Sequence, residues 1–461
     1  MRPGWILVAL GLLGCDDAAS TGASSAGSSS GGGAASSSSV SSASASTSAA
    51  TTTASSSGVG GGVLGYDVTT AVVTTDHRFI DGAMFGGWGP HLGHLLTDAS
   101  GTAYFVDDVC AQAPGGPLAK CDVLDDHTLG YFRRGPARWT PIGTIDLPGT
   151  VQQNTASILS ADGASLETFG IDVASNHVVE CAFPLPSGPP SCASLPFVLG
   201  PSSNYIGAAI SPAGYRMVWW TGVVDGGGGS FHYIVDYGGG WNGPRSGTAA
   251  GYNDASYIHI GFPTDAPARF VMHAQLVSGL APNWSFFGGV GVGDLTTTDP
   301  VAFTLPLAAV GGSDPIASTD DVWVDPVTQD EHLLARTEAG AAAYFHRAPG
   351  GDWSPALFVL ASTFRARFAA HGDRVALVSG PSGGGLAVRV AGPGDRVAGA
   401  PIDWQGIAPI QPSLPPGYAD VYAIYPAGPP YQLAGGPDIE LAVVAAERQN
   451  EVLAVRLAPS P

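Results

Sequence analysis

An all-β fold is predicted by the composition of the chain and by two recurring hairpin patterns. The 461 residues include 66 glycines and 37 prolines, a content that disfavours long helices. Three stretches place aromatic residues on both arms of a Pro/Gly turn: Tyr131–Pro141, Tyr233–Pro244 and Tyr344–Pro355. Aromatic side chains suit a pleated, half-buried surface, and Gly and Pro supply turn dihedrals. Three such hairpins in one chain indicate a repeated β unit.

The second pattern is a short apolar run, a turn of small residues and another apolar run. It occurs seven times, with turns that begin at positions 97, 160, 211, 263, 325, 371 and 426, spaced 46 to 63 residues apart. A second hairpin follows each of the first six turns. These second hairpins are the three aromatic ones and the stretches Val178–Phe197, Trp284–Phe303 and Leu386–Pro401.

Seven units of two hairpins resemble a β-propeller that covers residues 63–461. We expect seven blades, with six or eight as alternatives and two β-sandwiches as the competing architecture. The last unit has only Val452–Leu457 for its second hairpin, so Tyr66–Val73 is expected to pair with it and close the ring. Leu441–Leu457 is also compatible with a helix, but its valines favour two strands.

Charge excludes one class of partner. The formal net charge is −20, Lys120 is the single lysine, and the longest basic run is Arg133-Arg134. Nucleic-acid binding needs a concentrated basic surface, so no nucleic-acid partner is expected. The acidity also opposes non-specific attraction to anionic lipid.

The N-terminus carries an export signal. A basic start is followed by the apolar run Trp5–Leu13, which is too short to span a bilayer as a helix. Leu12-Leu13-Gly14-Cys15 then resembles the lipobox of bacterial lipoproteins. The resemblance implies cleavage of residues 1–14, acylation of Cys15 (the palmitate type of anchor) and attachment to a bacterial membrane, facing the periplasm or the cell surface. A plain secretory signal is the alternative.

Residues 15–62 are composed almost wholly of Ser, Ala, Gly and Thr after Asp16 and Asp17. Such a segment buries too little apolar surface to fold, so it is predicted to be a disordered tether. About 45 flexible residues have a root-mean-square span of roughly 35–40 Å. The tether would therefore hold the folded domain away from the membrane.

Four cysteines follow Cys15, in two pairs with the same separation of eleven residues: Cys110 and Cys121, Cys181 and Cys192. Export and an even count favour disulfides, and we expect the local pairing Cys110–Cys121 and Cys181–Cys192. A zinc site is the weaker alternative, because no Cys-x-x-Cys motif occurs. No metal and no cofactor are expected.

Motifs that resemble catalytic sites have simpler explanations. Gly380–Gly384 matches Gly-x-Ser-x-Gly, but it lies between two strand patterns and is interpreted as a hairpin turn. His91 and His94 are too few for a metal site and are interpreted as surface loop residues. Adjacent carboxylates are interpreted as solvated turn residues, because neighbours on a strand point to opposite faces. They are Asp107-Asp108, Asp125-Asp126 and Asp320-Asp321.

The sequence gives no catalytic pattern. Sialidases share the propeller architecture, but Ser160–Gly163 lacks the Gly and Trp spacing of their Asp box. Tryptophans are interpreted as core residues by default, with sugar stacking as the alternative. They are Trp88, Trp219, Trp220, Trp241, Trp284, Trp323 and Trp353.

The expected function is that of a non-catalytic binding or scaffold module for an envelope protein or glycan. The alternative is a propeller-type glycoside hydrolase or lyase, for which Arg, Tyr and carboxylate side chains from several blades would have to meet at a mouth of the channel. The oligomeric state is not predicted.

Overall fold

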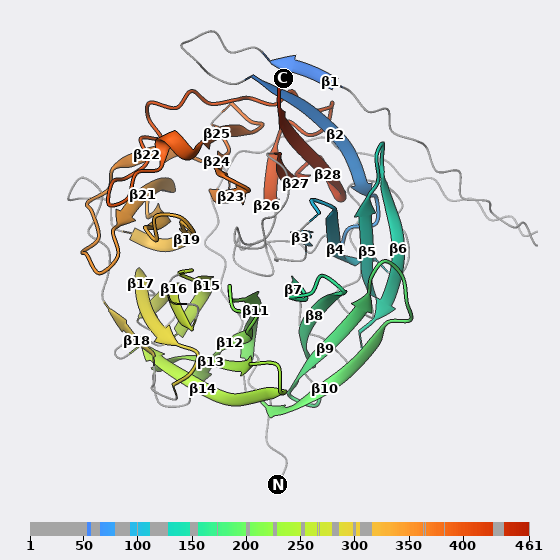
Figure 1. Cartoon of the computed structure of the whole chain (residues 1–461), viewed down its shortest axis with the longest axis vertical. Coiled ribbons are helices and arrows are strands. Elements are labelled where there is room, and N and C mark those ends of the chain that lie inside the picture. Colours follow the sequence, from blue (N-terminus) through green and yellow to red (C-terminus); the bar gives the residue numbers. More distant parts are fainter. Residues whose placement is uncertain are drawn as a thin grey trace, which may run out of the picture.

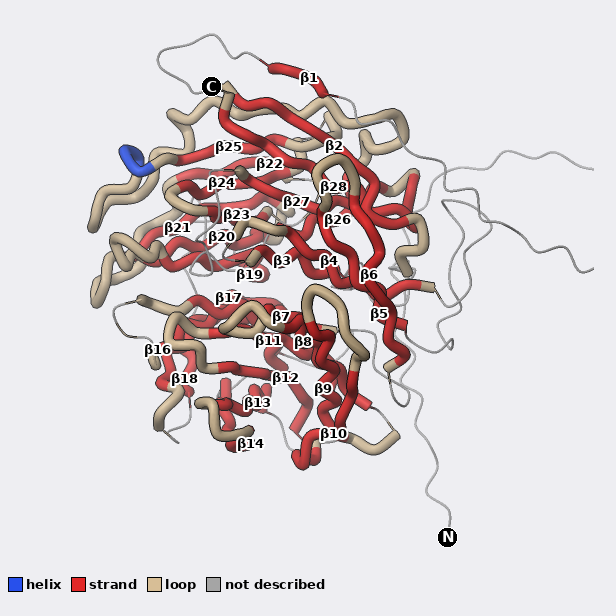
Figure 2. The backbone as a smooth tube through the Cα atoms, turned by 45° about the vertical axis from the view of Figure 1, so that its right-hand side comes forward, coloured by secondary structure: helices blue, strands red, loops and turns tan. Residues whose placement is uncertain are grey.

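The computed structural model is a seven-bladed β-propeller (Figure 1), as the repeat predicts. Nearly all of its regular structure is strand (Figure 2), and the one helical turn described is η2 (Pro393–Asp395). The structure describes residues 53–56, 65–78, 93–98, 100–110, 128–147, 155–172, 174–199, 203–224, 228–249, 254–264, 266, 268–278, 285–297, 301–304, 316–362, 364, 366–381, 383–426 and 438–460.

Each blade is an antiparallel sheet that begins near the central axis, and we number the blades in chain order. Blade 1 consists of β3 (Gly93–Thr97), β4 (Ala103–Val109), β5 (Thr128–Arg134) and β6 (Trp139–Asp146), and blade 2 of β7 (Ala156–Leu159), β8 (Ser165–Asp172), β9 (His177–Pro184) and β10 (Ser191–Val198). Blade 3 consists of β11 (Ser203–Ile210), β12 (Arg216–Val224), β13 (Gly228–Asp236) and β14 (Trp241–Ala249). Blade 4 consists of β15 (Asp254–Gly261), β16 (Arg269–Ser278), β17 (Ser285–Asp294) and β18 (Val301–Thr304).

Blades 5 to 7 follow the same plan. Blade 5 consists of β19 (Ile316–Val324), β20 (Glu331–Thr337), β21 (Ala341–Arg347) and β22 (Phe358–Ala361), and blade 6 of β23 (Arg367–His371), β24 (Arg374–Ser379) and β25 (Ala387–Ala391). Blade 7 consists of β26 (Val421–Pro426), β27 (Ile439–Ala445), β28 (Arg448–Pro459), β2 (Tyr66–Thr74) and β1 (Thr53–Ser56). In the described part of blade 6 the fourth position is taken by a single bridge between Val388 and Ile410.

The seven small-residue turns of the sequence all join the first and second strands of a blade. In blades 1 to 5 the second hairpin joins the third and fourth strands, as at Arg134 and Trp139, which are register partners across the β5–β6 hairpin. The expected second hairpin Leu386–Pro401 is wrong: in the described part of blade 6, β25 is followed by the helical turn η2 and not by a fourth strand. Blades 3 and 4 are also joined through a parallel pairing of β14 with β18, at Gly247 and Val301. Sequence position in the repeat therefore predicts strand position in the blade.

The ring closes through the N-terminal strand, as predicted. β2 pairs antiparallel with β28 along its length, with Val68 opposite Leu457. The stretch Leu441–Leu457 forms β27 and β28 rather than a helix. β1 adds a further strand outside β2 and lies inside the segment whose composition predicts a tether.

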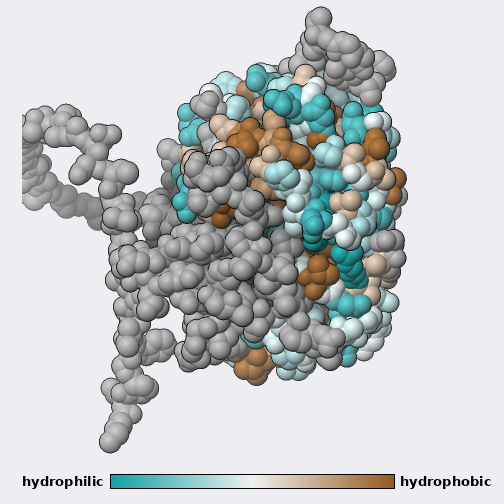
Figure 3. Space-filling view, turned by 90° about the vertical axis from the view of Figure 1, so that its left-hand side faces the viewer, coloured by the Kyte–Doolittle hydropathy of each residue, from teal (hydrophilic) through white to brown (hydrophobic). Residues whose placement is uncertain are grey.

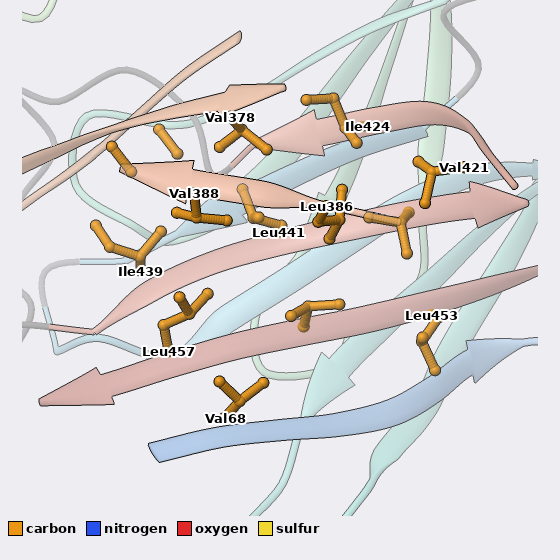
Figure 4. Close-up of a cluster of buried hydrophobic side chains, with 14 of the residues drawn as sticks. Val68, Val378, Leu386, Val388, Val421, Ile424, Ile439, Leu441, Leu453 and Leu457 are labelled. Atoms are coloured by element: carbon orange, nitrogen blue, oxygen red, sulfur yellow. The ribbon is translucent and has the colours of Figure 1, made fainter. Parts of the chain in front are cut away.

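The core is distributed between the faces of neighbouring blades. Between blades 6 and 7, Val378 and Val388 pack against Leu441, Ile424 and their neighbours (Figure 4). Small residues allow close approach, and a Cβ atom added at Gly93 would lie 2.5 Å from Phe105. On the side of the molecule that carries blade 5, the hydrophobic and hydrophilic residues coloured in the space-filling view are mixed (Figure 3).

Candidate binding sites at the blade junctions

One cluster of charged and aromatic side chains lies between blades 2 and 3, and Arg216 is at its centre. Arg216 begins β12, and its register partner is Asp236 at the end of β13. Its Nη1 donates to Glu167 (2.8 Å) and Glu180 (2.7 Å) of blade 2, and its Nε donates to Asp236 (3.2 Å). The Cζ atom lies 4.7 Å from the centroid of the Trp241 ring.

The local sequence explains this geometry. The turn Tyr237-Gly238-Gly239-Gly240 has positive φ at Gly238 (95°) and Gly240 (107°), which glycine adopts without strain. The N–H groups of both glycines donate to Oδ1 of Asp236, at 2.8 and 2.9 Å. The turn thereby fixes Asp236 on one side and starts β14 at Trp241, whose Nε1 donates to Glu180 (3.0 Å).

The environment moves the pKa values of two carboxylates in opposite directions. Burial raises the pKa of Glu167 above its ordinary value, more than the hydrogen bond from Arg216 lowers it. For Asp236, burial also raises the pKa, but the hydrogen bonds from Arg216, Gly240 and Gly238 together outweigh it and leave the pKa below its ordinary value. The hydrogen bonds of the cluster therefore favour the ionised form of Asp236.

A second cluster lies between blades 4 and 5, with Glu331 at its centre. Glu331 begins β20, and its register partner is Arg347 at the end of β21. Arg347 donates through Nε to Glu331 at 3.0 Å, and Arg269 of blade 4 donates to the same carboxylate at 3.4 Å. The Cζ atom of Arg347 lies 4.7 Å from the Trp353 ring centroid. The two clusters therefore use one plan with the charges exchanged.

Unpartnered polar atoms surround the second cluster. His273 of β16 is fully buried with its ring 5.3 Å from that of Trp353, and neither of its ring nitrogens has a hydrogen-bond partner among the described residues. Burial, aided by Arg347, lowers the pKa of His273 to about 3, so the ring is neutral. The Nε1–H of Trp353 is likewise without a partner in the described chain.

A third junction, between blades 7 and 1, is simpler. Arg134 at the end of β5 forms an ion pair with Glu440 of β27 and donates to the Gly101 carbonyl at 2.7 Å. Trp139 in the same hairpin is buried, so its ring is not available to a ligand. This contact ties the closing blade to blade 1.

Charged residues also meet at the channel. Arg367 begins β23 of blade 6, and its Nη1 lies 3.4 Å from Nε2 of His259 in blade 4. Asp321 of blade 5 lies 3.7 Å from the other ring nitrogen of His259. Burial raises the pKa of Asp321 to about 6, although Arg367 and the Phe368 N–H oppose the shift. The innermost strands of three blades, β15, β19 and β23, thus bring a histidine, a carboxyl group and a guanidinium group together.

The carboxylate pairs contradict the prediction of solvated turn residues. Asp107 and Asp108 lie in β4 and are fully buried, where they bind His77 (2.8 Å) and Arg78 (3.0 Å) respectively. They point to opposite faces, as neighbours on a strand must, and each meets a cationic or histidine partner from the described residues that directly follow β2.

The second pair, Asp320 and Asp321, lies in β19 rather than in a turn. Asp320 is fully buried and accepts hydrogen bonds from Arg336 at 3.2 and 3.0 Å. Asp125 and Asp126 lie outside the described residues.

The prediction that His94 is a surface loop residue is also wrong. His94 lies within β3, and its Nε2 bonds to the Thr155 carbonyl at 2.8 Å. Burial lowers the pKa of His94 to about 4, so the ring is neutral and its Nε2–H donates. His91 lies outside the described residues.

The structure also places the Gly-x-Ser-x-Gly stretch and five of the seven tryptophans. The Gly380–Gly384 stretch joins β24 to β25, as a hairpin turn should. Of the tryptophans, Trp219, Trp220 and Trp323 are buried in the core, Trp241 and Trp353 are half-buried at junctions, and Trp88 and Trp284 lie outside the described residues.

The predicted disulfide Cys181–Cys192 is confirmed; its two residues are register partners on β9 and β10. Cys110 is also disulfide-bonded, while its predicted partner Cys121, like Cys15, lies outside the described residues.

Sequence reasoning did not identify Arg216, Glu331 or Arg347 as site residues. The aromatic hairpins that contain Trp241 and Trp353 were the available signal, because each sits beside a charged end of the third strand. The partners on the preceding blade, such as Glu167 and Arg269, are separated from these hairpins by dozens of residues, and spacing alone does not bring them together.

Among the described residues no group of three or more His, Cys, Asp or Glu side chains is placed to hold a metal ion. Within the same residues, no helix has the length and apolar character needed to cross a membrane.

The chain matches no protein family and no curated protein by sequence. Its fold is similar to that of the BP39L lectin from Burkholderia pseudomallei, at 13% identity and a TM-score of 0.53, with 80% of this chain and 95% of the lectin covered. A protein of unknown function from Dyadobacter fermentans is similar at 11% identity and a TM-score of 0.50, with 85% and 98% covered. These likenesses concern the propeller fold.

Proposed function

We propose that the chain is a non-catalytic binding module that recognises glycans at its blade junctions. The observation that carries the proposal is the pair of clusters in which an arginine lies 4.7 Å from a half-buried tryptophan ring, beside carboxylates of adjoining strands. An aromatic ring can pack against the apolar face of a sugar, while an Arg guanidinium group donates hydrogen bonds to its hydroxyl oxygens and a carboxylate accepts hydrogen bonds from its hydroxyl groups.

The placement of the clusters favours binding over scaffolding alone. Arg216 and Arg269 are partly exposed (23% and 34% of the side chain), so a ligand in solution can reach them. A ligand site typically combines apolar surface with a few fixed polar groups, and each junction places a tryptophan ring beside fixed charged groups. The shared propeller fold of a known lectin is compatible with this reading but does not name a sugar.

A glycan array probed with the whole chain, solubilised in detergent, tests the proposal. We expect the chain to bind at least one glycan class. The affinity should fall about tenfold when Trp241→Ala and Trp353→Ala are combined, because a planar ligand stacked on an aromatic side chain gains on the order of 1–3 kcal/mol, the value known for nucleobases. Trp139→Phe, at the junction whose tryptophan is buried, is the matched control. An array without any bound glycan would reject the proposal.

We also propose that Cys15 anchors the module to a bacterial membrane, within the cell envelope. Support comes from the lipobox-like sequence that precedes Cys15 and from the Ser/Ala/Gly-rich residues that follow it. Several acyl chains on one residue would give a stable anchor. In fractionated cells, Cys15→Ser should move the protein from the membrane to the soluble fraction, and sedimentation of this variant with lipid would contradict the anchor.

A glycoside hydrolase is the second candidate, because Arg367, Asp321 and His259 meet from three blades at the channel. Glycosidases need one carboxyl group that is protonated near neutral pH, and burial raises the pKa of Asp321 to about 6. Turnover of aryl glycosides that is abolished by Asp321→Asn would favour the enzyme, whereas unchanged substrate over days would exclude it.

A further inference from the structure

The junctions between blades 2 and 3 and between blades 4 and 5 carry opposite charge. In the first, Arg216 faces the three carboxylates of Glu167, Glu180 and Asp236. In the second, Arg269 and Arg347 share the single carboxylate of Glu331. Carboxylates therefore outnumber guanidinium groups in the cluster between blades 2 and 3, and guanidinium groups outnumber carboxylates in the cluster between blades 4 and 5. The formal net charge of the whole chain is −20.

The reversal occurs at equivalent positions. The first residue of the second strand pairs with the last residue of the third strand in both blades: Arg216 with Asp236, and Glu331 with Arg347. The partner from the preceding blade changes sign as well, from Glu167 to Arg269. Each tryptophan lies against an arginine, which is Arg216 of the second strand in one blade and Arg347 of the third strand in the other. The aromatic part of the site is thus constant while the charge that faces a ligand is inverted.

The positive junction holds an exposed guanidinium group that makes only one long side-chain contact. The Glu331 side chain is 1% exposed and already covered by two arginines, so it presents little negative charge to a ligand. The Arg269 side chain is a third exposed, and its one side-chain hydrogen bond in the described chain is the 3.4 Å contact with Glu331. The Trp353 Nε1–H and the ring nitrogens of the fully buried His273 are unpartnered among the described residues.

We propose that the junction between blades 4 and 5 binds the carboxylate of an acidic sugar, such as a uronic or sialic acid, with Arg269 as its main partner and the Trp353 ring against the sugar. A guanidinium group holds a carboxylate through two parallel hydrogen bonds, which a neutral hydroxyl group cannot reproduce. This inference rests on the proposed glycan binding. It adds the ligand class and assigns neutral or amino sugars to the junction between blades 2 and 3.

The test compares two single-charge variants of the whole chain on an array of uronic-, sialic- and neutral-terminated glycans, followed by calorimetry with the best acidic ligand. Arg269→Gln removes the exposed guanidinium and one long contact, so the fold should persist. Arg456→Gln is the control, because it removes the same charge from a side chain that is 42% exposed and paired with Asp438, away from both clusters.

Acidic glycans should bind, lose about tenfold or more in affinity in Arg269→Gln, and keep their affinity in Arg456→Gln. Their binding should also weaken as salt is raised from about 0.05 to 0.5 M. Binding of neutral glycans alone, or equal effects of the two variants, would overturn the acidic-sugar assignment and leave the proposed function standing. Absence of any glycan binding would reject both.

Discussion

Arg216 lies over the indole ring of Trp241, with its Cζ atom 4.7 Å from the ring centroid, while three carboxylates from two blades surround the same guanidinium group. One side chain therefore joins blade 2 to blade 3. Removal of the arginine would leave Glu167, Glu180 and Asp236 close together without a counter-charge, and each of them is largely shielded from water.

We predict that Arg216→Gln lowers the free energy of unfolding by about 2 kcal/mol, which is less than the roughly 3–5 kcal/mol lost when one partner is removed from a fully buried pair, because the cluster is partly exposed. Urea denaturation at pH 7 measures the change. Arg138→Gln, in the exposed turn after β5, is the control and should leave the midpoint within error. Equal stability of the two variants would mean that the cluster serves the ligand alone.

The Cys181–Cys192 disulfide joins register partners on β9 and the outer strand β10. Replacing both cysteines by serine should cost about 3 kcal/mol, the chain-entropy value for a loop of this length. Thermal unfolding with and without reductant gives the test. Reductant should lower the unfolding temperature of the native chain by breaking this disulfide. The double variant lacks the disulfide, so this part of the effect of reductant should disappear.

Local sequence was sufficient to predict most of the fold. The small-residue turns predicted the first hairpin of every blade because a tight turn needs Gly, Asp or Pro whatever surrounds it. The closing strand β2 was predictable by elimination, since the last unit lacked a partner for its outer edge. The strand preference of valine predicts two strands within Leu441–Leu457, and the structure confirms them as β27 and β28.

The site was much less accessible from sequence, because its contacts cross between blades. The prediction that Asp107 and Asp320 are solvated turn residues is wrong, because each has a histidine or arginine partner that lies on another strand or loop. The exchange of Arg216 and Asp236 for Glu331 and Arg347 becomes visible only once the strand register is known. No local pattern encodes it.

Closure of the ring makes a prediction about truncation. A chain that begins at residue 57 lacks β1 and should keep most of its stability, because β2 still pairs with β28. A chain that begins at residue 75 lacks β2 as well and leaves the buried Leu457 without Val68 opposite it. An exposed hydrophobic edge promotes aggregation, so the second truncation should be insoluble or lose several kcal/mol. Soluble yield and thermal midpoints of the two truncations decide the matter.

Asp321 gives the fold a dependence on pH. Burial raises its pKa to about 6, so the folded chain holds a proton that an unfolded aspartate releases near pH 4. The contribution of this residue to stability is therefore complete below about pH 4 and is lost as the pH rises through about 6.

Asp321→Asn keeps a neutral side chain at every pH, and its carbonyl oxygen can still accept from the Phe368 N–H, which donates to Asp321 at 2.8 Å in the native chain. The stability of the variant relative to the native chain should therefore increase from pH 4 to pH 6 and stay constant above it. Urea denaturation of both proteins at half-unit intervals measures this difference. A difference that is flat across this range would place the pKa of Asp321 near its ordinary value and remove the carboxyl group from consideration as a proton donor at the channel.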